Sequence, residues 1–137
     1  SGKTDGTVST MEGAAAVAAV ARQNFAHLKL AHIQLTEGNF DITLPAVITQ
    51  LPAIGLAFID GNHRKEPTLD YFRQLLTKIG NDSILIFDDI HWSKGMEEAW
   101  EHISMHPDVT LTIDLFFIGI VFINPDFKIK QQFRIRF

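Results

Sequence analysis

Two apolar runs of this sequence end on residues that could do acid–base or metal chemistry. Leu56–Ile59 is followed by Asp60 and, three residues later, by His63, and Ile84–Phe87 is followed by the pair Asp88-Asp89. Short apolar runs of this kind are typical of strands that are covered on both faces. If the two strands are parallel neighbours, their carboxyl ends lie at one edge of the sheet, and we expect these polar side chains to meet in one pocket.

The side chains at these strand ends suit two kinds of chemistry. Asp60, Asp88 and Asp89 offer the oxygen ligands that a hard divalent ion such as magnesium prefers, and converging carboxylates need such a cation or a donor to offset their repulsion. His63 could act as a general base, because an imidazole titrates near working pH. Plainer interpretations stay open: Asp89 as a helix cap beside a solvated Asp88, and His63 as an ordinary solvated loop residue.

Other polar side chains also stand at predicted strand ends, and their roles are less sharply defined. Glu12 and Glu37 are each about one strand–helix unit from the next such acid. An acid at the position of Glu12 either accepts hydrogen bonds from ribose hydroxyls or favours the N-terminus of a helix; for Glu37 we favour an ordinary polar loop. The acid pair is followed by His91 and Trp92. We expect these two residues to form either a wall of a substrate site or a packed loop.

The elements that must position these residues alternate between strands and helices. The predicted strands cover 7–11, 30–36, 54–60, 83–88, 109–115, 119–123 and 127–137. The predicted helices cover 13–28, a segment from a cap at Asp41 or Thr43 to about Leu51, 67–79, and 93–106. This order predicts an α/β, Rossmann-like fold with a mostly parallel sheet, helices on both faces and an antiparallel C-terminal edge.

Length and composition narrow the class of protein. The 137 residues suit a single domain, residues 1–137. A net charge of −4 argues against nucleic acid as the main partner, and the absence of cysteine excludes disulfides and thiolate chemistry. The apolar run Leu115–Ile123 is too short to span a bilayer, and no signal-peptide pattern is present. We therefore expect a soluble, cytoplasmic protein with a small-molecule partner and no membrane partner.

At its two strand-end motifs the chain resembles the class I S-adenosylmethionine-dependent methyltransferases. The similarity is to the small-molecule O-methyltransferase group, which has an Ile-Asp-Gly-X-His stretch and a later Asp-Asp pair. Those motifs correspond here to Ile59–His63 and Phe87–Ile90, and the resemblance extends from Val8 to the end of the chain. Each motif is short, so it is their order and spacing together that make the resemblance specific.

The resemblance implies a role for each strand-end residue. It places Glu12, Gly13 and Asp60 at the cofactor S-adenosylmethionine, with Glu12 on the ribose. It implies that Asp60, Asp88 and Asp89 hold magnesium, as the corresponding acids do in metal-dependent members. It also implies that a histidine like His63 takes the proton of the acceptor hydroxyl.

The resemblance further implies a first strand and a Gly-rich loop ahead of Glu12. Only eleven residues precede Glu12, and they contain no Gly-X-Gly pattern. We therefore expect an N-terminally incomplete domain whose first strand is missing between the strands that end at Glu12 and Asp60. Such a gap exposes backbone groups that must find partners, so those strands would pair directly, or the chain would dimerise.

Three hypotheses of function follow. The leading one is a methyltransferase-fold protein whose intact form carries out metal-assisted O-methylation of a small hydroxylated acceptor, although without the Gly-rich loop we expect poor cofactor binding and doubtful activity. The alternative is a non-catalytic, truncated interaction module or homodimer that obtains its missing strand from another chain. A two-carboxylate hydrolase built on Asp60 and Asp88 is the third, and it predicts turnover without a methyl donor.

Overall fold

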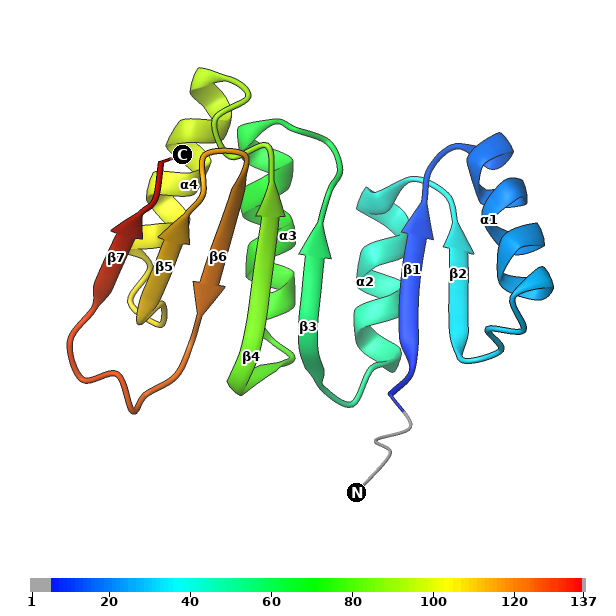
Figure 1. Cartoon of the computed structure of the whole chain (residues 1–137), viewed down its shortest axis with the longest axis horizontal. Helices are drawn as coiled ribbons and strands as arrows, with labels where there is room; N and C mark the ends of the chain where they lie inside the picture. Colours follow the sequence, from blue (N-terminus) through cyan, green and yellow to red (C-terminus); the bar gives the residue numbers. More distant parts are fainter. Residues whose placement is uncertain (1–5, 137) are drawn as a thin grey trace. The chain divides into compact units, whose positions relative to one another are not determined.

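The computed structural model describes residues 6–136 and divides the chain into two compact units, Ser1–Gln50 and Leu51–Phe137. The first unit contains β1 (Val8–Glu12), α1 (Ala15–His27), β2 (Ile33–Glu37) and α2 (Phe40–Gln50). The second contains β3 (Ile54–Ile59), α3 (Lys65–Leu76), β4 (Ile79–Asp88), α4 (Lys94–Met105), β5 (Leu111–Asp114), β6 (Ile118–Phe122) and β7 (Gln131–Arg134), as labelled in Figure 1. Among the described residues, no helix has the length and apolar character needed to cross a membrane.

In the first unit, β1 and β2 form a two-stranded parallel sheet. Helix α2 begins at Phe40, earlier than predicted, because the side-chain oxygen of Asn39 accepts a hydrogen bond from the backbone N–H of Asp41 at 3.0 Å. The expected caps at Asp41 or Thr43 are therefore wrong. Pro45 lies inside the helix, where Leu44 is among its buried residues.

In the second unit, five strands form one sheet in the order β3-β4-β6-β5-β7. β3 pairs with β4 in parallel, β6 is antiparallel to both β4 and β5, and β7 is parallel to β5. The predicted α/β, Rossmann-like fold with a mostly parallel sheet is confirmed. The antiparallel strand is β6, which lies inside the sheet, whereas the outermost C-terminal strand runs parallel to its neighbour.

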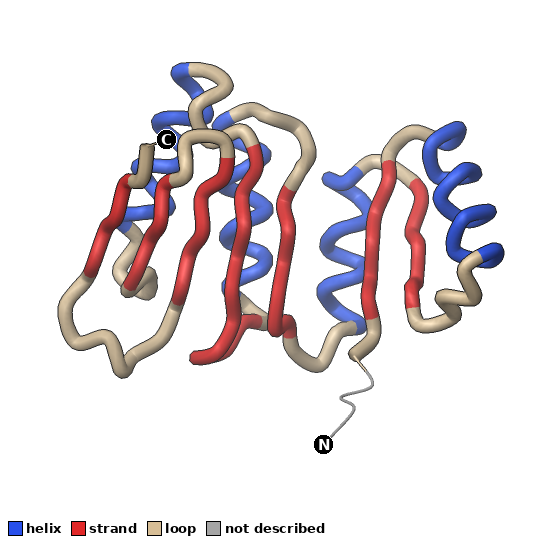
Figure 2. Tube along the Cα trace, in the orientation of Figure 1, coloured by secondary structure: helices blue, strands red, loops and turns tan. Residues whose placement is uncertain are grey.

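Helices α3 and α4 pack on the same face of the five-stranded sheet, behind the strands in the view of Figure 2. On that face Phe72 of α3 makes an edge-to-face contact with Phe87 of β4, with ring centroids 6.1 Å apart. Trp100 of α4 lies against Gly119 of β6. The core of this unit therefore lies between the two helices and one face of the sheet, where Leu85 and Phe87 are fully buried.

Two predicted boundaries in this unit are wrong. Ile79 was expected on the helix, but α3 ends at Leu76, and Ile79 begins β4 opposite Ile54. The backbone N–H of Ile54 also donates to the carbonyl of Lys78, so pairing with β3 overrides the local helical pattern. The last strand was expected over 127–137, of which only Gln131–Arg134 pairs in the sheet; Phe137 lies outside the described residues.

Gly119 is required by the packing of α4 on the sheet. A Cβ atom at this position would lie 2.5 Å from a ring carbon of Trp100, which is closer than non-bonded atoms approach. We expect Gly119→Ala to lower the free energy of unfolding by about 1–3 kcal/mol through overpacking. Gly55→Ala is the matched control, because no atom lies within 4 Å of a Cβ there. Urea unfolding checks both; equal stabilities would contradict this account of the packing.

Candidate functional site

The parallel pairing of β3 and β4 brings Asp60, His63 and Asp89 together at the carboxyl ends of the two strands. Nε2 of His63 lies 3.6 Å from Oδ1 of Asp60, and Nδ1 lies 3.8 Å from Oδ2 of Asp89. These distances are too long for hydrogen bonds, but they place a carboxylate near each ring nitrogen. The three side chains are partly exposed, so the ring is accessible to a ligand.

Two residues with left-handed backbone conformations shape this group. Asn62 has a φ of 53° and Asp89 a φ of 52°, values that Asn and Asp tolerate better than most residues. The side chain of Asn62 is held on both sides: its oxygen accepts from Nε of Arg64 at 2.7 Å, and its nitrogen donates to the hydroxyl of Tyr71 at 3.3 Å. The turn that returns His63 towards the strand ends is therefore fixed by specific contacts.

The two acids of the pair have different surroundings. Asp88 still belongs to β4 and stands opposite Ile118 of β6. Asp89 has left the strand, and its carboxylate faces His63. Only one of the pair therefore joins Asp60 and His63, because the change in φ at Asp89 ends the alternation of side chains along the strand.

The predicted magnesium ligands do not converge in this arrangement. Within residues 6–136, no group of three or more His, Asp or Glu side chains is placed to hold a metal ion. The oxygens of Asp60 and Asp89 are of the kind magnesium prefers. However, these two carboxylates lie at opposite nitrogens of the His63 ring, so the ring stands between them where a shared ion would have to lie. These residues as they stand do not fit the ion, and the metal role of Asp60, Asp88 and Asp89 stays a prediction.

In the first unit, Glu12 ends β1 next to the N-terminus of α1. Its Oε1 accepts a hydrogen bond from the backbone N–H of Ala14 at 2.7 Å, as an acid at a helix N-terminus does. Gly13 follows it, and a Cβ there would meet only the carbonyl oxygen of Gly38, at an ordinary 3.7 Å. Glu37 forms an ion pair with Arg22 at 2.7 Å. The proposed cofactor roles of Glu12 and Gly13 stay predictions.

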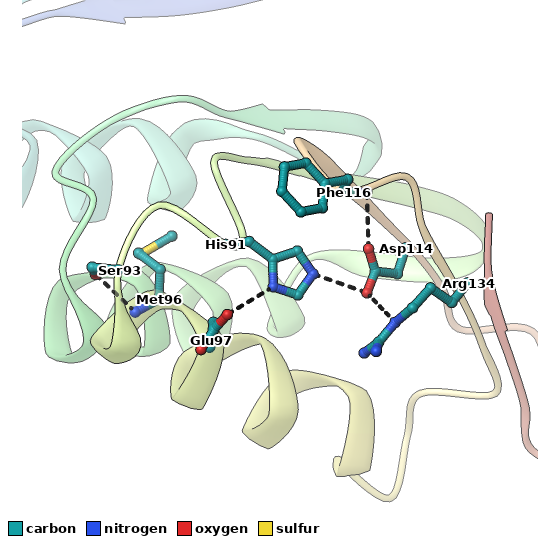
Figure 3. Close-up of polar contacts among 7 residues, drawn as sticks. All are labelled: His91, Ser93, Met96, Glu97, Asp114, Phe116 and Arg134. Carbon is teal, nitrogen blue, oxygen red and sulfur yellow. Dashed lines mark hydrogen bonds and ion pairs between the residues drawn. The ribbon is translucent and has the colours of Figure 1, made fainter. Parts of the chain in front are cut away.

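A second polar cluster, shown in Figure 3, was missed in the sequence and is centred on Asp114. This buried carboxylate accepts hydrogen bonds from the backbone N–H of Phe116 and from Nε of Arg134, both at 2.9 Å. It also lies 3.0 Å from Nε2 of His91, whose Nδ1 is 3.3 Å from Oε1 of Glu97. Burial raises the pKa of Asp114, but these hydrogen bonds and charges together hold it below its ordinary value.

This cluster connects the loop after β4 to α4, β5 and β7. His91 belongs to that loop and stacks on Phe116, with ring centroids 5.5 Å apart. His91 is therefore packed against its neighbours, whereas Trp92 is 72% exposed, and a role of either residue in a substrate wall stays a prediction. Asp114 is the last residue of β5. The search for acids at strand ends that singled out Asp60 would therefore also have found Asp114, had it been applied to β5.

A comparison with protein families decides the assignment of this fold. Residues 3–90 match the family model described as a methyltransferase domain, which covers more than half of the chain. The chain belongs to this methyltransferase family. A search of curated proteins gave no significant match.

Solved methyltransferase structures share the fold of this domain. They include an SAH-bound Podospora anserina methyltransferase (TM-score 0.73, 16% identity, 89% of this chain and 62% of that chain). Also similar is a putative O-methyltransferase from Klebsiella pneumoniae, with a TM-score of 0.72 and 22% identity over 88% of this chain and 63% of that chain. A third is a Bacillus cereus O-methyltransferase in complex with SAH, with a TM-score of 0.68 and 21% identity over 85% of this chain and 63% of that chain. This methyltransferase domain thus spans less than two thirds of the length of each of these three proteins.

The Asp114 cluster predicts a pH-dependent contribution to stability. A lowered pKa stabilises the folded state above the ordinary aspartate pKa, and this stabilisation is lost as the pH falls through the lowered value. We expect Asp114→Asn to cost about 1–3 kcal/mol at about pH 7, because Arg134 and His91 lose their buried charged acceptor. In urea unfolding the difference from wild type should shrink at about pH 3; a difference that stays constant with pH would contradict this role.

Proposed function

We propose that this methyltransferase domain transfers the methyl group of S-adenosylmethionine to a hydroxyl oxygen of a small acceptor, with His63 as the general base. The family match supports methyl transfer. Two of the similar structures contain SAH, which supports the cofactor. Two of them are described as O-methyltransferases, which supports the oxygen acceptor. The observation that carries the proposal is the placement of His63 between Asp60 and Asp89 at the carboxyl edge of β3 and β4.

The residues of the group suit the transfer of one proton. S-adenosylmethionine, when bound, supplies a sulfonium methyl that is already activated, so the protein has to align the acceptor oxygen with that carbon. His63 would accept the hydroxyl proton as the oxygen attacks. The imidazolium formed in this way would lie between the carboxylates of Asp60 and Asp89, which stabilise its charge and keep the ring oriented.

The cofactor would be held at the carboxyl end of β1. Glu12 offers a carboxylate there, the group that accepts hydrogen bonds from ribose hydroxyls in folds of this kind. Gly13 leaves the backbone beside it uncovered by a side chain. These two residues fit a ribose.

Substitution of His63, the proposed general base, tests this proposal. His63→Gln should lower methyl transfer to a panel of small phenols and alcohols by at least about 100-fold, because general-base catalysis contributes that much. Binding of S-adenosylmethionine, measured by calorimetry, should not change. His27→Gln, on α1, is the control and should keep full activity.

Two results would contradict the proposal. A wild-type chain that neither binds S-adenosylmethionine nor transfers its methyl group would favour the alternative, a non-catalytic module. Unchanged transfer in His63→Gln would remove His63 as the base.

We also propose that magnesium assists the transfer, and this role is tested separately by measuring magnesium binding. No step described above depends on a metal, because the three carboxylates do not converge as they stand. If Asp60, Asp88 and Asp89 rearrange to bind magnesium, calorimetric titration should detect the ion in the wild type, and Asp60→Asn should weaken its binding by about tenfold or more. Equal binding in both proteins would count against the metal role.

A further inference from the structure

The loop Asp89–Ser93, between β4 and α4, connects the group around His63 to the cluster around Asp114. At the start of this loop, Oδ2 of Asp89 lies 3.8 Å from Nδ1 of His63. Two residues further on, Nε2 of His91 lies 3.0 Å from Oδ2 of Asp114. The two polar groups are therefore joined by a very short stretch of backbone.

Asp89 has a backbone conformation that needs support from its surroundings. Its φ of 52° lies in the left-handed region, which Asp tolerates better than most residues but does not prefer. Such a residue keeps this conformation only where the structure around it fixes the chain. The carbonyl of Asp89 accepts a hydrogen bond from the N–H of Trp92 at 2.9 Å, and the intervening Ile90 is fully buried. The direction of the Asp89 carboxylate thus depends on how residues 90–92 are held.

The side chain of His91 anchors these residues to three other parts of the second unit, as Figure 3 shows. An ionised carboxylate can only accept a hydrogen bond, so Nε2 of His91 donates to Asp114 of β5. Nδ1 lies 3.3 Å from Oε1 of Glu97 on α4, and the ring stacks on Phe116 of the turn between β5 and β6. The His91 side chain is only 18% exposed. The ring is therefore fixed on several sides.

The turn that carries Phe116 is itself held in an unfavourable conformation. Phe116 has a φ of 73°, which is an outlier for a bulky residue. Oδ1 of Asp114 accepts the backbone N–H of Phe116 at 2.9 Å, while Oδ2 of the same carboxylate binds His91. One buried carboxylate thus holds both this turn and the His91 ring. Backbone strain of this kind is concentrated in active sites and ligand-binding segments.

We propose that His91 is a positioning residue for methyl transfer. By tying the loop to Asp114 it keeps the carboxylate of Asp89 beside Nδ1 of His63, and so keeps the His63 ring oriented to take the proton of the acceptor. The inference rests on the proposed function, because His91 acts through the proposed base and does not itself touch the substrate.

Arg134 provides a matched comparison for this role. Its Nε donates to Oδ2 of Asp114 at 2.9 Å, the same oxygen that binds His91. However, Arg134 belongs to β7, at the edge of the five-stranded sheet opposite to β3. Loss of either side chain removes one hydrogen bond from Asp114, but only loss of His91 releases the loop that carries Asp89.

The kinetics of methyl transfer by the full chain test the proposal. His91→Leu should lower kcat by about 10- to 100-fold, because a small displacement of a catalytic group costs this much. Binding of S-adenosylmethionine, measured by calorimetry, should not change. His91→Gln should retain most of the activity, since its amide can still donate to Asp114, and Arg134→Leu should keep the wild-type kcat. An equal loss of kcat in His91→Leu and Arg134→Leu would overturn the proposal.

A double-mutant cycle with Asp89 shows whether His91 acts through this residue. Asp89→Gly removes the carboxylate and adopts the same φ without strain. In the Asp89→Gly background, His91→Leu should lower kcat little further, because the contact that His91 maintains is already absent. Losses that multiply in the double variant would contradict a role through Asp89.

Nuclear Overhauser contacts of the His63 ring measure the positioning without turnover. In His91→Leu the contact from the ring to the β-protons of Asp89 should be lost and the contact to Asp60 kept, whereas Arg134→Leu should keep both. If circular dichroism shows that His91→Leu is unfolded, His91→Asn takes its place, because its shorter side chain does not reach Asp114.

The same measurement separates this inference from the proposed function. A wild type without methyl transfer whose contact between His63 and Asp89 is lost in His91→Leu would remove the proposed function and leave the positioning by His91 standing. A folded His91→Leu or His91→Asn protein that keeps the contact to Asp89 would overturn the inference, whatever its activity.

Discussion

The parallel pairing of β3 with β4 is the constraint on which the candidate site depends. Ile59 stands opposite Phe87 in this pair, so both strands end at the same level of the sheet. Residues that are distant in the sequence therefore meet there, and His63 lies within 4 Å of acids from both strand ends. The register of this pair therefore fixes the site as well.

Local backbone conformation then decides which acids take part. Asn62 and Asp89 both adopt left-handed φ values, and they flank the histidine on the two sides of the group. Asp88 keeps its place in β4, opposite Ile118, while Asp89 turns to His63. The cluster around Asp114 anchors the same loop from the other side through His91.

The sequence predicted the fold well where periodicity and strand ends were clear, as at Leu56–Ile59 and Ile84–Phe87. It failed where contacts between distant residues override a local pattern: Ile79 fits a helical stripe, yet pairing with Ile54 makes it part of β4. The separation of Asp88 from Asp89 depends on one φ angle, which the residue types do not specify. Asp114 was missed because the predicted strand 109–115 placed it inside the strand, whereas β5 ends at Asp114.

The strands themselves indicate two buried faces, since Ile84–Phe87 is apolar at every position. One face of this sheet meets α3 and α4. The geometry of the site at the strand ends is tested most directly by nuclear Overhauser contacts of the His63 ring. The account predicts contacts from the ring protons of His63 to the β-protons of both Asp60 and Asp89. A ring that contacts Asp60 alone, or neither acid, would contradict it.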